Sequence, residues 1–332
     1  MVKIGNITLP DFPLLLAPME DVSDPPFRRL CKLHGADLMY SEFISSEGLI
    51  RDAIKSRKKL DIFDYERPVG IQIFGGDEEA MAMSARIVET VEPDLVDINF
   101  GCPVKKVVCK GAGAGVLKDI DLMVRLTKAV VQSTHLPVTV KTRLGWDTEG
   151  INIDEVAERL QDTGIKALTI HARTRAQMYK GEADWTHISR IKNNPNIEIP
   201  IFGNGDIDSP QKALEYKQKF DCDGIMIGRG AIGYPWIFNE IKHYFETGEL
   251  LPEPTISDRL LAVKQHAEWS VEWKGERIGL VEMRQHYSNY FRGIPHFKDF
   301  KRQFLSIFTL EEMDELIKKC EDFYANFDFE NN

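Results

Sequence analysis

The sequence predicts a (β/α)8 barrel followed by an all-helical domain. Eight short, apolar, β-rich runs recur along the first two-thirds of the chain, and the segments between them show the acidic starts and the periodicity of helices. Several runs are apolar on both faces, which is typical of strands buried in a parallel sheet. Eight such units over about 230 residues favour a barrel over a doubly wound sheet, which the count alone leaves open.

The expected strands alternate with helices in chain order. One expected helix starts at Asp77 (DEEAMAMSARIVETV), and another covers 153–164 (IDEVAERLQDTG) and stops at a glycine. The eight expected strands are residues 14–19, 38–43, 69–74, 95–100, 137–143, 167–173, 200–206 and 223–229.

The pattern changes after Ile237. The linker TGELLPEPT is rich in proline and glycine, and residues 257–327 read as three or four helices. We therefore expect two domains, a catalytic barrel at residues 1–244 and a helical domain at residues 245–332.

Composition and cysteine usage indicate a globular protein of a reducing compartment. The 332 residues are 43% hydrophobic and 28% charged, which is enough to bury a core without disulfides. The five cysteines include no CxxC pair, so neither a zinc site nor a redox pair is expected. The N-terminus lacks the apolar core of a signal peptide, and no apolar run approaches the roughly 20 residues of a membrane span. We expect a cytoplasmic protein with no metal and no membrane partner.

In such a barrel the chemistry gathers at the C-terminal ends of the strands, so the residues there are candidates for a functional site. Small and polar residues occupy most of these positions and predict one ring of polar groups around one mouth. In chain order they are Ala17, Pro18, Met19, Gln72, Asn99, Cys102, Lys141, Arg143, His171, Arg173, Asn204, Gly205, Asp206, Gly228 and Arg229.

Two glycine-containing turns predict a phosphate-bearing ligand. GNGD (203–206) and GRG (228–230) follow the seventh and eighth runs, where barrels commonly bind phosphate with backbone N–H groups and a helix N-terminus. Glycine lets the backbone come close to an anion. Each turn alone could be an ordinary loop, but the pair favours a bound phosphate.

Two basic side chains at this mouth have both a structural and a chemical interpretation. Lys141 lies inside a β-run, so it either pairs with a carboxylate of the barrel or faces a cofactor or intermediate that becomes negative. His171 is a hydrogen-bonded core residue, a phosphate ligand or an acid–base group.

Cys102 stands between Gly101 and Pro103, where a strand ends and a loop begins. It is either a small packing residue or an acid or nucleophile. A thiol with a pKa of about 8.5 is mostly protonated at neutral pH and can deliver its proton. Lys105 and Lys106 would instead favour the thiolate, and the residues alone do not choose between these roles.

Eight stretches, in order over nearly the whole barrel, resemble the tRNA-dihydrouridine synthases and are most similar to the bacterial B-type. The helical tail resembles the family's C-terminal domain through weaker motifs. The stretches are LAPMEDVSDPPFRRLC, VGIQIFGGD, DLVDINFGCPVKKV, GAGAGVLKD, PVTVKTRLGW, ALTIHARTRAQMYKGEADW, IFGNGDI and DGIMIGRGAIGYPWIF.

This resemblance implies an FMN-binding TIM barrel that reduces selected uridines in tRNA to 5,6-dihydrouridine with NADPH, or NAD(P)H more broadly, as electron donor. It implies that reduced FMN gives hydride to C6 and Cys102 gives the proton to C5. Lys141 would stabilise the anionic reduced flavin. It also implies a helical tRNA-binding domain, and a monomer is favoured. The cofactor-binding residues that it implies are Ala17, Pro18, Met19, Gln72, Lys141, His171, Asn204, Gly205, Asp206, Gly228 and Arg229.

Four positions depart from the family's usual pattern. Glu20 and Asp21 stand where the family usually has small residues, which adds negative charge near the flavin or the substrate. Ala172 replaces a glycine between the histidine and the arginine, and Gly115 replaces a common alanine. None of them is the expected acid, so we expect them to affect substrate fit more than chemistry.

A formal net charge of −10 requires a local basic surface if the partner is RNA. The stretch 284–302 (RQHYSNYFRGIPHFKDFKR) is the best candidate, and the alternative is a solvated helix face over buried aromatic residues. The residues expected to contact tRNA are Asn99, Arg143, Arg173, Arg175, Arg284, Arg292, Lys298, Lys301 and Arg302.

Two other functions compete with the favoured one. The first keeps the flavin and reduces a free small molecule, such as a pyrimidine or an enone, which would not need the helical domain with its basic stretch. The second is an RNA-binding protein or chaperone with an inactive catalytic site. The presence of Cys102, Lys141 and the glycine turns argues against this function.

Overall fold

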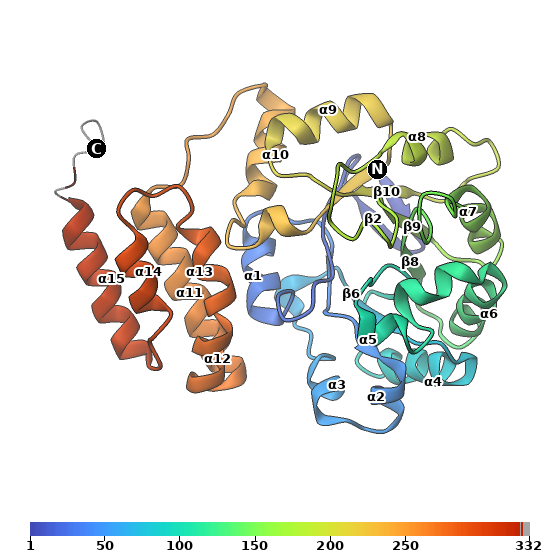
Figure 1. Cartoon of the computed structure of the whole chain (residues 1–332), viewed down its shortest axis with the longest axis horizontal. Coiled ribbons are helices and arrows are strands. Elements are labelled where there is room, and N and C mark those ends of the chain that lie inside the picture. Colours follow the sequence, from blue (N-terminus) through green and yellow to red (C-terminus); the bar gives the residue numbers. More distant parts are fainter. Residues whose placement is uncertain (326, 328–332) are drawn as a thin grey trace.

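The computed structural model describes residues 1–325 and 327. Eight parallel strands form a barrel surrounded by helices, as the sequence predicts (Figure 1). Their order in the sheet is β3-β11-β10-β9-β8-β7-β6-β4, and a bridge between Leu15 and Leu38 brings the first and last strands together. The strands are β3 (Leu14–Leu16), β4 (Met39–Tyr40), β6 (Val69–Phe74), β7 (Leu95–Asn99), β8 (Val138–Arg143), β9 (Ala167–His171), β10 (Ile201–Asn204) and β11 (Gly224–Ile227).

The N-terminal end of the barrel carries a hairpin that the sequence analysis did not predict. Strands β1 (Val2–Ile4) and β2 (Ile7–Leu9) pair antiparallel, and Val2 and Ile4 pack in the same cluster as Leu15 and Leu38. The expected strand at 38–43 is also divided, because β4 ends at Tyr40 and β5 (Ile44–Ser45) pairs with a later part of β6.

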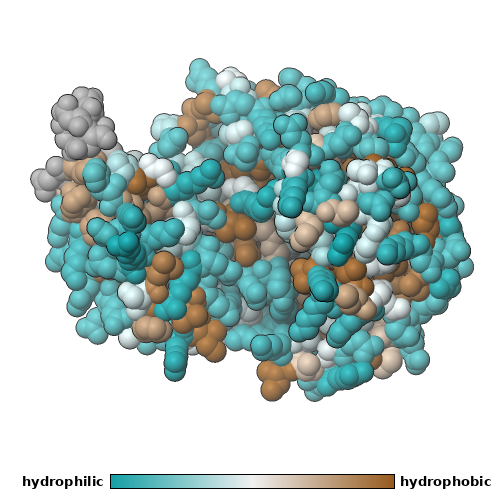
Figure 2. Space-filling model, in the orientation of Figure 1, coloured by the Kyte–Doolittle hydropathy of each residue, from teal (hydrophilic) through white to brown (hydrophobic). Residues whose placement is uncertain are grey.

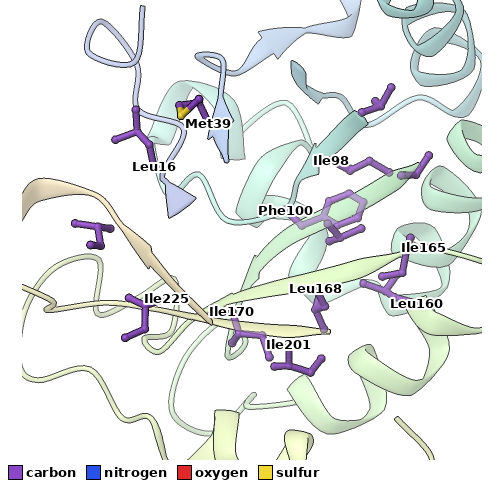
Figure 3. Packing of buried hydrophobic residues seen from close by; sticks show 14 of the residues in the cluster. Leu16, Met39, Ile98, Phe100, Leu160, Ile165, Leu168, Ile170, Ile201 and Ile225 are labelled. Carbon is purple, nitrogen blue, oxygen red and sulfur yellow. The ribbon is translucent and has the colours of Figure 1, made fainter. Parts of the chain in front are cut away.

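The strands bury both of their faces, which explains why their sequences are apolar throughout. Outward side chains pack beneath the helices, and Figure 3 shows Leu168, Ile170 and Ile201 of neighbouring strands together in this outer layer. Inward side chains form a smaller cluster near the hairpin. The surrounding helices are α1 (Pro25–Leu33), α2 (Ser46–Ile50), α3 (Ile54–Lys58), α4 (Glu78–Glu89), α5 (Lys105–Val108), α6 (Ile120–Val131), α7 (Ile153–Gln161), α8 (Thr186–Lys192), α9 (Pro210–Phe220) and α10 (Ile237–Thr247).

The C-terminal part is helical, and it lies beside α1 and α10 (Figure 1). It contains five helices in the described residues, more than the three or four expected. Met283 separates α12 from α13, and the turn at 291–297 separates α13 from α14, where the sequence suggests longer helices. The five helices have a hydrophobic core of their own. The helices are α11 (Ile256–Lys274), α12 (Glu276–Glu282), α13 (Arg284–Tyr290), α14 (Lys298–Phe304) and α15 (Leu310–Ala325). The domain limit expected after residue 244 stays a prediction. In the structure residue 244 lies inside α10, which continues to Thr247.

The helical part packs on the barrel through α1 and the residues just before it. The Phe27 ring of α1 lies 5.6 Å from the ring of His266 and 5.1 Å from the ring of His286. The Lys274 ammonium lies 2.7 Å from the Asp24 carboxylate, and both side chains are more than 90% buried. Apolar packing and a buried ion pair therefore hold the two parts together.

No helix in the described part of the chain is long and apolar enough to cross a membrane.

The Lys274–Asp24 ion pair gives a first prediction. Lys274→Met should lower the free energy of unfolding by about 3 kcal/mol, because it leaves the Asp24 carboxylate buried without its counter-ion. Urea unfolding followed by circular dichroism measures this difference. Lys318→Met, at an exposed position of α15, is the matched control and should change little; equal stabilities of the two variants would show that the pair does not matter.

Candidate active site at the mouth of the barrel

A chain of polar side chains fills the barrel interior above its apolar layer. Gln72 on β6 donates from Nε2 to Oδ2 of Asp97 on β7 at 2.6 Å. Asn99, at the end of β7, donates from Nδ2 to Oε1 of Gln72 at 2.8 Å. The strand pairing puts Gln72 opposite Asp97, so these groups meet inside the barrel.

Asp97 is a site residue that the sequence analysis missed. Its side chain is 1% exposed, and the Thr139 hydroxyl donates to its second oxygen. Burial raises the pKa of Asp97 to about 6, while the bonds from Gln72 and Thr139 and the charge of Lys141 lower it. The sequence feature that could have identified Asp97 is a single carboxylate in the middle of the apolar run LVDINF, where an unpaired charge is unfavourable.

The Cys102 thiol sits on a turn that Asn99 holds. Oδ1 of Asn99 accepts hydrogen bonds from the backbone N–H groups of Gly101, at 2.9 Å, and Cys102, at 2.8 Å. On the other side, Nε of Arg143 donates to the Gly101 carbonyl at 2.7 Å. The turn is therefore fixed from both flanks.

The surroundings of Cys102 favour the protonated thiol. The residue is 7% exposed. Burial raises the pKa of its thiol, and the charge of Glu20 raises it further, whereas the Val104 N–H and the cations Arg143 and Lys141 lower it without cancelling the shift. At neutral pH the sulfur keeps its proton.

Cationic side chains occupy the opposite part of the mouth. The Lys141 ammonium donates to Oδ1 of Asn204 at 3.1 Å, and Asn204 donates to the Met226 carbonyl at 2.7 Å. Burial lowers the pKa of Lys141 to about 8, with Arg143 acting in the same direction and Asp97 against it. Lys141 thus forms no ion pair with a carboxylate within the described residues.

His171 at the end of β9 is buried, and its Nε2 has no hydrogen-bond partner among the described residues. Burial lowers the pKa of His171 well below its usual range, and the nearby cations Arg143, Lys141, Arg173 and Arg229 add to this effect. A neutral imidazole with a free ring nitrogen, surrounded by cations, is suited to an anionic or hydroxyl-bearing ligand.

The Asp206 carboxylate accepts hydrogen bonds from two arginines at the mouth. Arg173 donates to both of its oxygens, at 2.8 and 2.6 Å, and Arg229 donates to one at 3.2 Å. Although burial alone would raise it, the pKa of Asp206 lies below its usual value because of the bonds from Arg173 and from the Ala183 N–H. One carboxylate facing several cations leaves this corner positively charged.

The glycine turns leave space beside these cations. Gly205 has a φ of +128°, and a Cβ there would lie 2.9 Å from the Ala183 Cβ and 3.2 Å from His171 Cδ2. A Cβ on Gly228 would point toward Ala17 and Met19, 3.5 Å from the Ala17 Cβ. The free imidazole nitrogen, the surplus positive charge and these open backbone turns together fit a phosphate-bearing cofactor.

Ala17, Pro18 and Met19 lie at the edge of the same mouth. The Ala17 N–H donates to the Ile227 carbonyl at 2.8 Å, which continues the pairing of β3 with β11 one residue beyond the strand. Ala17 is buried, whereas Pro18 and Met19 are partly exposed. Ala17 and Met19 present apolar groups next to Gly228.

The departures at Glu20 and Asp21 have local partners. Asp21 has a φ of +59°, a left-handed conformation that aspartate adopts more readily than most residues. Its N–H donates to the Glu42 carboxylate at 2.7 Å, and Lys59 lies 2.6 Å from Glu20 and 3.3 Å from Glu42. Lys59 therefore offsets part of the added negative charge.

Two arginines expected to contact tRNA lie inside the site. Arg143 and Arg173 are each 2% exposed. Nη1 of Arg143 donates to the carbonyls of Thr174 and Met178, and Arg173 pairs with Asp206. Arg175 is partly exposed and lies over the Trp146 ring at 4.6 Å.

The basic stretch at 284–302 divides into an aromatic interior and a cationic exterior. Its buried side chains are His286, Tyr287, Tyr290, Phe291 and Phe297. Of its cations, Arg302 pairs with Asp299 and Arg284 lies over the Phe308 ring; within the described residues Arg292, Lys298 and Lys301 form no ion pair. The face shown in Figure 2 is largely hydrophilic, with apolar residues near the hollow between the helical part and the barrel.

Comparison with protein families and curated proteins gives consistent matches. The family model described as "Dihydrouridine synthase (Dus)" matches residues 15–327. The chain is 40% identical to a probable tRNA-dihydrouridine synthase of Rickettsia conorii over 91% of this chain and 90% of that protein. It is 39% identical to tRNA-dihydrouridine synthase B of Pseudomonas aeruginosa, over 98% and 96% of the two chains.

Solved structures that resemble this chain share its fold at low sequence identity. Morphinone reductase in complex with tetrahydroNAD superposes with a TM-score of 0.52 at 12% identity, covering 77% of this chain and 92% of that chain. 2-Naphthoyl-CoA reductase superposes with a TM-score of 0.57 at 13% identity over 73% of this chain, which spans about half of that longer protein.

The environment of Cys102 predicts its reactivity. Near neutral pH, iodoacetamide should modify Cys102 about tenfold more slowly than the exposed Cys109, because the raised pKa and the burial of Cys102 both reduce the available thiolate. Peptide mass spectrometry over time measures both rates. Glu20→Gln should speed the reaction at Cys102 alone; equal rates for the two cysteines in the unaltered protein would contradict the assigned environment.

Proposed function

Because this chain belongs to the dihydrouridine synthase family, we propose that it reduces selected uridines of tRNA to 5,6-dihydrouridine. The observation that carries the proposal is a buried, protonated thiol on a fixed turn at the barrel mouth, facing a positively charged pocket that fits a phosphate-bearing cofactor. The names of the relatives, tRNA-dihydrouridine synthase and its B-type, supply the substrate.

FMN is the cofactor we propose. His171, Asn204, Gly205 and Gly228 would hold its ribityl chain and phosphate. Arg173 and Arg229 together carry more positive charge than Asp206 offsets, and this surplus would attract the phosphate.

The flavin ring would lie against the apolar edge of the mouth. Ala17, Pro18 and Met19 would contact its face. Within residues 1–325 and 327 the Gln72 side chain bonds to Asp97 and Asn99, which leaves one amide hydrogen to donate to the ring. Lys141, with a pKa of about 8, is mostly protonated at neutral pH and would stabilise negative charge on the ring. Bound there and reduced, FMN would supply the hydride for C6 of the uracil ring.

Cys102 would complete the reaction as a general acid. Adding hydride to C6 leaves an anion that is neutralised when C5 takes up a proton. Because its pKa is raised, the Cys102 thiol is protonated at neutral pH and has that proton to give. The resulting thiolate would be stabilised by Arg143 and Lys141 until solvent returns the proton. The target base must leave its stack to reach this mouth.

The remaining parts of the proposal concern the partners. NADPH is the proposed electron donor. The helical part, through Arg292, Lys298 and Lys301, is the proposed surface for the tRNA backbone, because these three cations form no ion pair with a carboxylate of the residues that the structure describes. A cytoplasmic location follows from a tRNA substrate and a reducing environment for free cysteines.

The decisive experiment incubates the purified protein with NADPH and tRNA that lacks dihydrouridine, followed by mass spectrometry of the nucleosides. A gain of two hydrogens on specific uridines is expected and would map the position. If protein shown to carry FMN leaves tRNA unchanged but oxidises NADPH in the presence of free pyrimidines or enones, the function is reduction of a small molecule.

Replacement of the proposed acid tests the mechanism. Cys102→Ala should slow tRNA-dependent turnover by about 100-fold or more, since C5 loses its proton donor. Flavin absorbance and tRNA affinity should stay unchanged. Cys109→Ala, at an exposed cysteine of the same region, is the control and should keep full activity; full activity of Cys102→Ala would exclude the thiol as the acid.

Charge reversal tests the tRNA surface. Arg292→Glu with Lys298→Glu should weaken tRNA binding by about tenfold or more at moderate salt and reduce its salt dependence. NADPH oxidation by the flavin should be unaffected. Arg86→Glu with Lys128→Glu, on exposed positions of α4 and α6, is the matched control; equal tRNA affinities for the two double variants would place the RNA elsewhere.

A further inference from the structure

A continuous chain of hydrogen bonds joins a buried carboxylate to the turn that carries the thiol. It runs from Asp97 to the Gln72 amide, then to the Asn99 amide, and ends at the backbone N–H groups of Gly101 and Cys102. Its four links are 2.6 to 2.9 Å long. Its three side chains come from two neighbouring strands, β6 and β7, whose pairing is fixed by the barrel.

Asp97 sets the direction of this chain. A side-chain amide has a donor end and an acceptor end of similar size, so Gln72 and Asn99 could each sit in two orientations. An ionised carboxylate only accepts, so Gln72 must turn its NH2 toward Asp97 and its carbonyl toward Asn99. Asn99 must then turn its own carbonyl toward the turn. In the reversed orientation its NH2 would face the N–H groups of the turn.

We propose that Asp97 is a positioning residue for the Cys102 thiol, acting by fixing the orientation of the Gln72 and Asn99 amides that hold the turn. The residue acts through others, because its contacts are to Gln72 and Thr139. This inference rests on the proposed function, since it gives Asp97 a part in delivering the proton to C5.

The electrostatics of Asp97 argue against a role in stability alone. Burial raises the pKa of Asp97 from 3.8 to about 6. A carboxylate with a folded-state pKa above its unfolded value makes folding less favourable as pH rises from about 4 to about 6, and the penalty is complete above that pH. At neutral pH the barrel thus holds a charge that destabilises it, which is common where a residue serves the site.

Two substitutions of Asp97 distinguish its role as a hydrogen-bond acceptor from the effect of its negative charge. Asp97→Leu removes the acceptor and should slow the single-turnover oxidation of reduced flavin by tRNA about 10- to 100-fold, because the turn loses its fixed orientation. Asp97→Asn keeps an acceptor for Gln72, since the Thr139 hydroxyl can turn to accept from the new amide. That variant should stay within about threefold of the unaltered protein. Reduction of the flavin by NADPH should be slowed much less than the tRNA step in both, because that half-reaction does not use the Cys102 turn.

The outcomes distinguish the alternatives. A loss in Asp97→Asn as large as in Asp97→Leu would show that the charge facing Lys141 matters and would overturn the proposal. So would an equal slowing of both half-reactions, or full activity of Asp97→Leu. If Asp97→Leu does not fold, Asp97→Ala removes the same acceptor with a smaller side chain and must slow the tRNA step selectively; an unchanged rate there overturns the proposal.

A control and a second readout keep the inference separate from the proposed function. Thr127→Val, a buried hydroxyl on α6 whose only side-chain bond in the described residues is to the Met123 carbonyl, should leave both half-reactions unchanged. Amide hydrogen exchange at Gly101 and Cys102 should be about tenfold faster in Asp97→Leu and near normal in Asp97→Asn. If the unaltered protein fails to reduce tRNA, the proposed function fails; if exchange is unchanged in Asp97→Leu, the positioning role fails.

Discussion

The burial of charged groups inside a parallel barrel is the constraint on which the site depends. Each ionised group there must find a partner, because an unpaired charge away from water is strongly unfavourable. Asp97 is satisfied by Gln72 and Thr139, and Asp206 by Arg173 and Arg229. These two carboxylates order the polar groups around them, one on the side of the thiol and one on the side of the glycine turns.

The two halves of the mouth consequently differ in charge. On one side, burial and the Glu20 carboxylate keep the Cys102 thiol protonated. On the other, burial, with the cations Arg143, Lys141, Arg173 and Arg229 in addition, lowers the pKa of His171 and keeps it neutral, and the cations attract an anion. A proton donor and an anion-binding pocket can thus coexist in one small space, which is what a flavin-dependent reduction of a base would require.

The helical part is attached where the site begins. Its residues contact Asp24 and Phe27, and the Gln285 amide donates to the Asp21 carbonyl, two residues beyond Met19. The turn that carries Glu20 and Asp21 is therefore held by the barrel and by the helical part together. These contacts set where the helical part lies relative to the barrel mouth.

Local sequence determined the barrel, the starts of its strands and the ring of residues at the mouth, because strand periodicity, glycine turns and a cysteine between glycine and proline are local features. Five of the eight strands end two or three residues earlier than the sequence predicts. Tertiary structure alone decided the partners. Gln72 and Asp97 are 25 residues apart, and Lys141 and Asn204 are 63 apart. Inward placement of Arg143 and Arg173, the N-terminal hairpin and the role of Asp97 escaped prediction for the same reason. A side chain's charge and hydrogen bonds become defined only when barrel closure brings distant strands into register and excludes water from between them.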